Sequence, residues 1–281
     1  MEIGENNNNN NITSFFKKNV NFTNTENFHL SIEVSPTKLK YTLLNTENLE
    51  YLLFKSVEVV NNLLTTIGSE EILKQTFFST SMCYSNFPTT IVPNELYSEI
   101  NKERYLQFIS DKKGTIKTDK IHQNNATTIY SVKEDIVHLM NQMQSGVIEK
   151  NSSTIIIEQL IKQYKNLTEK TAFLFINRKN IELIILKKGE LILHNYFDVN
   201  NSIDVLYYTL FGFNQLKMNP EESNLYLFGN IEKGDENYIL IYDYIRNIKF
   251  GSLSNFLSFN EELKRVSQHQ NFSLFSQILC V

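Results

Sequence analysis

Short apolar runs separated by polar turns recur along the chain. The clearest set lies in the second half, where runs rich in isoleucine, leucine and phenylalanine span Ala172–Ile176, Ile181–Leu186 and Leu191–Phe197. Asparagine, lysine and glycine occupy the turns between them, at Asn177–Asn180 and Lys187–Glu190. Runs of this length between such turns are typical of consecutive antiparallel strands, so this segment predicts a three-stranded meander.

Similar patterns predict the elements of the rest of the chain. In the first half these are strands at Phe28–Val34, Lys38–Leu44 and Leu49–Phe54, a helix at Ser56–Gln75, strands at Thr76–Tyr84 and Thr89–Val92, a helix from Pro93 to Phe108, a strand within Lys112–Asn125, a strand at Thr127–Val132, a helix at Lys133–Gln144, a strand at Gly146–Glu149 and a helix at Ser153–Asn166. After the second meander they are a helix at Asn201–Leu216, a strand at Asn224–Phe228, a helix at Glu236–Arg246 and a strand at Ile248–Leu253.

The order strand-strand-strand-helix-strand-helix-strand therefore occurs twice, beginning near Phe28 and near Ala172. An internal duplication of about 145 residues predicts two α/β lobes, each a mixed sheet flanked by helices, with a cleft between them. The expected domains are a disordered, asparagine-rich tail at 1–26, with Phe15 and Phe16 attaching part of it to the body, a first lobe at 27–168 and a second lobe at 169–281.

Composition narrows the classes of partner and compartment. The 281 residues are 41% hydrophobic and carry a net charge of −4, which gives no reason to expect nucleic acid or an anionic membrane as partner. Cys83 and Cys280 lie far apart, which suits a reducing cytoplasm and excludes a disulfide framework or a thiolate zinc site. The acidic, amide-rich start lacks the features of a signal peptide, and no apolar stretch approaches the roughly 18 residues of a membrane helix. We expect a soluble, cytoplasmic protein.

Familiar catalytic motifs are absent from the sequence. No GxxxxGK[ST], GxSxG or GxGxxG pattern occurs, and the five histidines have no metal-binding spacing, so no metal site is expected.

The duplicated meander followed by a helix resembles the actin-like ATPase (ribonuclease H-like) fold of actin, sugar kinases and Hsp70. Its spacing is similar to the branch that includes the pilus assembly protein PilM. The segments Phe28–Leu44, Thr89–Pro93, Glu95–Tyr97 and Tyr226–Gly229 resemble a bacterial family catalogued as domain of unknown function 3822, which is thought to adopt this fold. The resemblance covers the chain from Asn27 to the C-terminus.

The resemblance implies a nucleotide site whose motifs are degenerate here. In active members each lobe opens with a strand ending in Asp-x-Gly, where glycine admits phosphate and aspartate organises Mg²⁺. The matching triplets in this chain are Glu33-Val34-Ser35 and Phe175-Ile176-Asn177. Pro36 then removes an N–H group after the first triplet, and Arg178 and Lys179 follow the second.

A third motif, a strand leading into two glycines that meet the adenosine, corresponds to Leu225–Asn230 and keeps one glycine. The candidate nucleotide-binding residues are thus Glu33, Ser35, Asn177, Arg178, Gly229 and Asn230. Each also has a structural reading: a salt-bridged carboxylate for Glu33, turn solubility for Arg178, and backbone geometry for Gly229.

Three functions remain open. The loss of an acidic residue and of glycines favours a non-catalytic scaffold without a cofactor, which binds another protein as PilM-like relatives hold a partner's peptide. The alternative is a divergent ATPase or kinase that binds Mg-ATP through Glu33. A third reading is a site adapted to another small ligand or to nucleic acid, the latter disfavoured by the net acidity. The identity of the partner and the oligomeric state stay open.

Overall fold

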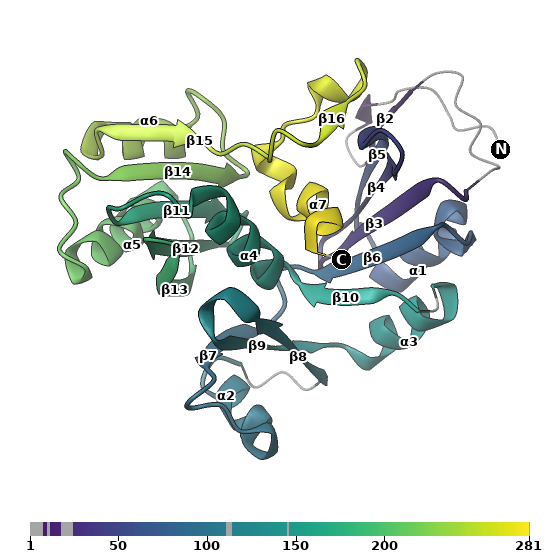
Figure 1. The fold of residues 1–281 in the computed structure, drawn as a ribbon, viewed down its shortest axis with the longest axis horizontal. Coiled ribbons are helices and arrows are strands. Elements are labelled where there is room, and N and C mark those ends of the chain that lie inside the picture. The colour runs from purple at the N-terminus through teal and green to yellow at the C-terminus, as the bar shows by residue number, and fades with distance from the viewer. Residues whose placement is uncertain (1–7, 10–11, 18–24, 111–113, 145, 281) are drawn as a thin grey trace. The chain divides into compact units, whose positions relative to one another are not determined.

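A computed structural model describes residues 8–9, 12–17, 25–110, 114–144 and 146–280 (Figure 1). Contacts divide the chain into two compact units. Unit 1 comprises Met1–Ile156, Ser254–Val266 and Ser273–Val281, and unit 2 comprises Ile157–Leu253 and Ser267–Phe272. Most of the tail expected to be disordered lies outside the described residues.

Unit 1 is built on a mixed sheet with the strand order β1-β2-β5-β4-β3-β6-β10, and β16 also pairs with β5. Its strands are β1 (Asn8–Asn9), β2 (Ile12–Phe16), β3 (Phe28–Val34), β4 (Lys38–Asn45), β5 (Glu50–Glu58), β6 (Ser79–Tyr84), β10 (Ile148–Asn151) and β16 (Ser258–Phe259). The meander β3-β4-β5 is antiparallel, whereas β6 runs parallel to β3 and β10 runs parallel to β6.

Unit 2 is built on a second mixed sheet with the order β13-β12-β11-β14-β15. Its strands are β11 (Thr171–Ile176), β12 (Asn180–Lys187), β13 (Glu190–Asp198), β14 (Asn224–Gly229) and β15 (Asn247–Phe250). Again the first three strands form an antiparallel meander, and the last two run parallel to its first strand. The segment β5-β4-β3-β6-β10 of unit 1 thus has the same topology, which confirms a duplicated fold.

The duplication extends to single hydrogen bonds. In each unit the turn after the first strand closes through an N–H···O=C bond of 2.9 Å, from Ser35 to Lys38 in unit 1 and from Asn177 to Asn180 in unit 2. The second and third strands of each meander also share a shift in register at the same place, between Leu43/Leu44 and between Ile185/Leu186.

Helices cover the sheets and bury their apolar faces. In unit 1, α1 (Leu63–Ser69) and α3 (Glu134–Met143) pack against each other and against the sheet, and the interior includes Ile67 and Met140. In unit 2, α5 (Ser202–Gln215) and α6 (Glu236–Tyr244) play the same part. The division between the units falls within α4 (Ser152–Tyr164).

An additional three-stranded sheet belongs to unit 1. It has the order β7-β9-β8, formed by β7 (Thr89–Pro93), β8 (Thr115–Ile121) and β9 (Ala126–Val132), and α2 (Lys102–Gln107) packs on it through Leu106. The buried Asp119 joins this sheet to the start of α4, because its carboxylate accepts the N–H of Asn151 and the hydroxyl of Thr154 at 3.0 Å.

The C-terminal segment of unit 1 returns to the sheet of that unit. Its two stretches, Ser254–Val266 and Ser273–Val281, contain a 3-10 turn at Leu263–Arg265, all of α7 (Phe272–Ser276) except its first residue, and a 3-10 turn at Gln277–Cys280. The 3-10 turn at His269–Asn271 belongs to unit 2. The Tyr51 hydroxyl donates to the carbonyl oxygen of Phe275 at 2.5 Å, and the amide of Gln277 donates to the carbonyl oxygen of Ile32 at 2.9 Å.

The structure corrects the predicted helix at Ser56–Gln75. Strand β5 continues to Glu58, and α1 begins only at Leu63. Asn62 caps the start of α1, because its side chain accepts a hydrogen bond from the N–H of Leu64. The apolar spacing fitted a helix, but β5 has hydrogen-bonded neighbours on both edges, β4 and β2, which favours the extended form.

Two further predictions also differ from the structure. The helix predicted from Pro93 to Phe108 is a turn followed by a 3-10 turn and the short α2, because Ile100 and Phe108 remain exposed and find no core to pack against. Within the expected disordered tail, Ile12–Phe16 forms β2, since the edge of β5 offers it backbone partners. Among the described residues, no helix is long and apolar enough to cross a membrane.

Candidate functional site

The turn after β3 lies where the resemblance places phosphate, and it is closed upon itself. The N–H of Ser35 donates to the carbonyl oxygen of Lys38, and the Ser35 hydroxyl donates to the same oxygen at 2.9 Å. The N–H of Lys38 donates back to Ser35 Oγ at 2.9 Å. Since Pro36 has no N–H, most of the donors of this turn are used within it.

Glu33, the one acidic residue of the two motif positions, is buried at the end of β3 and bonded to its own unit. Its Oε2 accepts a hydrogen bond from the Ser273 hydroxyl at 2.6 Å, and its Oε1 accepts one from the Ser85 hydroxyl at 3.2 Å. The ammonium group of Lys40, which faces Glu33 across the β3–β4 pair, lies 3.4 Å from Oε1. The carboxylate thus has a counter-charge and two donors.

Cys83, opposite Glu33 on β6, is a buried free thiol. Burial raises the pKa of the Cys83 thiol well above its usual value, and the negative charge of Glu33 raises this pKa further. A thiol held in its neutral form is a poor nucleophile, so this cysteine lacks the features of a catalytic one.

In unit 2 the turn after β11 repeats the closed geometry. The N–H of Asn177 donates to the Asn180 carbonyl, and the two side-chain amides bond each other at 2.9 Å. Arg178 and Lys179 lie exposed between them. The structure therefore places the two cations at the tip of this turn.

Gly229 and Asn230 lie beside this turn, at the end of β14. Gly229 has φ +80°, and a Cβ at this position would lie 2.2 Å from the carbonyl oxygen of Ile176. The next N–H, that of Asn230, donates to the same oxygen at 2.7 Å. The glycine thus allows two strands to approach closely, which is a sufficient structural reason for its presence.

The structure brings the predicted residues together within each unit, at the carboxyl ends of the central parallel strands. Glu33 and Ser35 form one group in unit 1, and Asn177, Arg178, Gly229 and Asn230 form another in unit 2. Sequence reasoning missed Ser85 and Ser273. Ser85 could have been found from the repeat, because it follows β6 as Asn230 follows β14, whereas nothing in the sequence pointed to Ser273.

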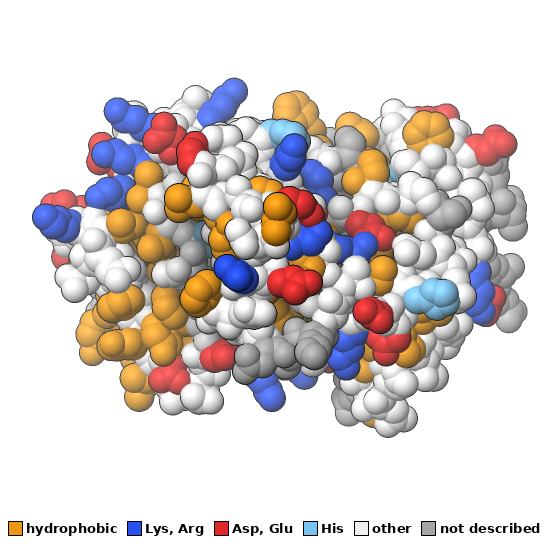
Figure 2. All heavy atoms as spheres, turned by 90° about the horizontal axis from the view of Figure 1, so that it is seen from below, with side chains coloured by type: hydrophobic (Ala, Val, Ile, Leu, Met, Phe, Trp, Pro, Cys, Tyr) orange, Lys and Arg blue, Asp and Glu red, His pale blue; other side chains and the backbone are white. Residues whose placement is uncertain are grey.

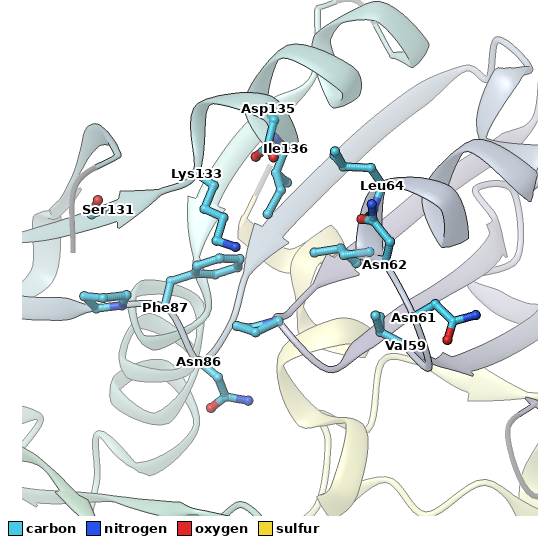
Figure 3. Close-up of a pocket in the computed structure, with 13 residues that line it drawn as sticks. Val59, Asn61, Asn62, Leu64, Asn86, Phe87, Ser131, Lys133, Asp135 and Ile136 are labelled. Carbon is cyan, nitrogen blue, oxygen red and sulfur yellow. Dashed lines mark hydrogen bonds between the residues drawn. The ribbon is translucent and has the colours of Figure 1, made fainter.

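Unit 1 also holds a cavity of about 630 Å³ beside the β3–β4 turn. It is lined by apolar side chains, among them Leu64, Phe87 and Ile136, and by polar ones that include asparagines, Lys133 and Asp135. Figure 3 shows Lys133 and Ile136 pointing into the space on one side and Leu64 on the other. Among the described residues, no carboxylate pairs with the Lys133 ammonium group.

No set of three or more histidine, cysteine, aspartate or glutamate side chains in the described part of the chain is arranged to hold a metal ion. The histidines within strands have ordinary polar partners. His29 is enclosed between the hydroxyls of Ser79 and Ser81 at 2.7 and 2.9 Å, and His194 lies 2.8 Å from Glu182.

Two sheets of this topology, each opening with a meander and joined in one chain, define the actin-like ATPase fold. A Bacteroides thetaiotaomicron protein with this fold and unknown function superimposes with a TM-score of 0.78 at 18% identity, over 93% of this chain and 99% of its own. A chain of the PilM–PilN type IV pilus biogenesis complex superimposes with a TM-score of 0.58 at 10% identity, over 90% of this chain and 98% of its own. At these identities the likeness establishes the fold alone.

The chain belongs to the family described as protein of unknown function (DUF3822), which matches residues 17–248. The resemblance noted from the sequence segments is thereby confirmed. No curated protein matches the chain.

Proposed function

We propose that this protein is a non-catalytic member of the actin-like fold that acts by binding another protein. The observation that carries the proposal is that Glu33, the carboxylate on which a Mg-ATP site would depend, already has partners in its own unit. Its oxygens accept hydrogen bonds from Ser85 and Ser273 and face the Lys40 ammonium group.

Mg-ATP is a poor fit to these residues. Mg²⁺ requires six oxygen ligands in near-octahedral geometry, and binding at Glu33 would place a divalent cation beside Lys40. It would also break hydrogen bonds to a charged group, each worth about 1.5–3 kcal/mol. The closed Ser35–Lys38 turn offers a triphosphate few N–H donors in return.

The cavity of unit 1 is the surface that we assign to the partner. Its apolar lining, with Leu64, Phe87 and Ile136, suits an apolar side chain of a partner segment. Lys133 and Asp135, which also line it, suit polar groups of that segment such as a main-chain carbonyl and N–H. The similar chain from the PilM–PilN type IV pilus biogenesis complex is part of a protein complex, which agrees with a binding role for this fold.

The catalytic alternative is tested by thermal unfolding and phosphate release with millimolar Mg-ATP, on the wild type and on Glu33→Gln. We expect no nucleotide-dependent rise in melting temperature and no phosphate release above background. Ligand at 100 times its Kd would stabilise the fold by about 2.7 kcal/mol, which is readily detected. A Mg-dependent rise that Glu33→Gln abolishes would refute the proposal.

The binding role is tested by a photo-crosslinking amino acid placed at Lys133 and expressed in the native cell. We expect a covalent adduct with one distinct polypeptide. The matched control is the same amino acid at Lys187, an exposed lysine of unit 2. Adducts of the same pattern at both positions, or adducts with a small molecule only, would contradict a protein partner in this cavity.

A further inference from the structure

The outer surface of α5 in unit 2 carries an exposed apolar stripe. Ile203, Tyr207 and Phe211 follow one another at four-residue spacing and are 70%, 60% and 39% exposed. The rings of Tyr207 and Phe211 are stacked, with centroids 6.3 Å apart. Side chains at this spacing share one helix face, so the stripe is a continuous apolar ridge.

Helix α6, which packs against α5, exposes a second apolar set. Ile239 and Tyr242, three residues apart and so on one side of α6, are each more than half exposed. The core of unit 2 is already filled from the opposite sides of both helices, by Val205 and Phe213 of α5 and Ile241 of α6 among others. We call these five exposed side chains of the two helices the α5–α6 face. Figure 2 shows hydrophobic side chains gathered on the part of the surface that belongs to unit 2.

Charge indicates what this face can bind. Within their bounds, α5 and α6 contain the acidic residues Asp204, Glu236 and Asp243 and no lysine or arginine. We infer that the α5–α6 face binds an amphipathic helix of another protein whose apolar side is flanked by basic residues. Apolar anchors and charge complementarity together define such helix-in-groove contacts.

The same charges disfavour the other occupants of an apolar face. A second copy of this chain, bound face to face, would bring Asp204, Glu236 and Asp243 against their own counterparts. An anionic membrane surface would find no lysine or arginine within these two helices, whereas interfacial helices bind such membranes through lysine and arginine. Tyrosine and phenylalanine are suitable anchors, since they bury a large area at a small cost in conformational entropy.

This inference assigns the protein a second binding surface. It rests on the proposed function only in taking the ligand to be a protein. The probe is a fluorescent amphipathic peptide with leucine and phenylalanine on one helical side and lysines on its flanks, measured by anisotropy with the full chain. We expect binding that weakens with salt and a loss of about tenfold or more in Tyr207→Ser. The same peptide with glutamates in place of the lysines should bind more weakly than the lysine peptide.

The matched control is Phe108→Ser, which removes an exposed aromatic side chain from unit 1 and should leave the affinity unchanged. Equal affinity of Tyr207→Ser and the wild type, or equal binding of the two peptides, would overturn the inference. So would a dimer in light scattering that Tyr207→Ser dissociates, or sedimentation with phosphatidylserine vesicles. Nucleotide binding and cavity crosslinking are separate readouts, so this inference and the proposed function can fail independently.

Discussion

Gly229 has two possible roles: it could allow the close approach of two strands, or it could contact a nucleotide. Replacing it with alanine is the sharpest test between the two. The residue ends β14 with φ +80°, and an added Cβ would lie 2.2 Å from the oxygen and 2.9 Å from the nitrogen of Ile176. Both contacts are with main-chain atoms of the neighbouring strand, so no side-chain rotation can relieve them.

The structure sets the size of the expected effect. A residue with a Cβ in the left-handed region costs about 1–2 kcal/mol. Parting β14 from the end of β11 also weakens the hydrogen bond from the Asn230 N–H to the Ile176 carbonyl oxygen, which is worth about 1 kcal/mol. With the remaining contact strain, Gly229→Ala should lower the free energy of unfolding by about 2–4 kcal/mol.

Urea titration followed by circular dichroism measures this loss. Gly234→Ala is the matched control, because Gly234 has φ +94° but nothing lies within 4 Å of its added Cβ. The control should show only the backbone term of about 1–2 kcal/mol. Equal losses in the two variants, or a loss below about 1 kcal/mol in Gly229→Ala, would show that close approach to Ile176 does not require the glycine.

Three further predictions concern the interior. Gly251→Ala places a Cβ 1.9 Å from the buried Phe228 ring, so overpacking should lower the free energy of unfolding by about 1–3 kcal/mol in urea. Burial lowers the pKa of His29 to about 4. Between about pH 6.5 and pH 4 this histidine is therefore protonated in the unfolded chain but neutral in the folded chain. Relative to His29→Gln, the wild type should lose stability as the pH falls from 6.5 towards 4, by at most on the order of 3 kcal/mol in urea titrations at each pH. Tyr51→Phe leaves the buried Phe275 carbonyl without its donor and should cost about 1–2 kcal/mol by calorimetry.

Each of these predictions has a matched control in the chain. Gly68→Ala, in a helix where nothing lies within 4 Å of the added Cβ, should be neutral or stabilising. His138→Gln removes an exposed histidine and serves as the control for the His29 comparison, and Tyr207→Phe removes an exposed hydroxyl at little cost. If a control variant lost as much stability as the variant to which it is matched, the argument from burial for that residue would be contradicted.

Much of the fold could be predicted from local patterns. The meander strands and α3, α4 and α5 have strong apolar periodicity and lie within a few residues of their predicted bounds. The errors fall where periodicity was ambiguous, as between Ser56 and Leu63, where pairing with β2 and β4 decided for a strand. They also fall where apolar residues at helical spacing have no core to pack against, as at Ile100 in the helix predicted from Pro93 to Phe108.

The candidate site was predictable only in part. The positions of Glu33 and Gly229 follow from the repeat of strand and turn along the sequence. The partners that neutralise Glu33 do not, since Ser273 approaches from the far end of the chain and Lys40 depends on strand register. The cavity beside Phe87 was likewise not predicted, because it joins residues from several loops, from α1 and from α3.

By itself, the sequence determined the duplicated α/β architecture of this protein, because the period of apolar residues selects strands and helices and its repetition selects the topology. Only the tertiary structure decided that the Glu33 carboxylate has partners within its own unit and that Gly229 adjoins the Ile176 carbonyl. Hydrogen bonds and close contacts depend on distances between residues far apart in the chain, and those distances are set by packing.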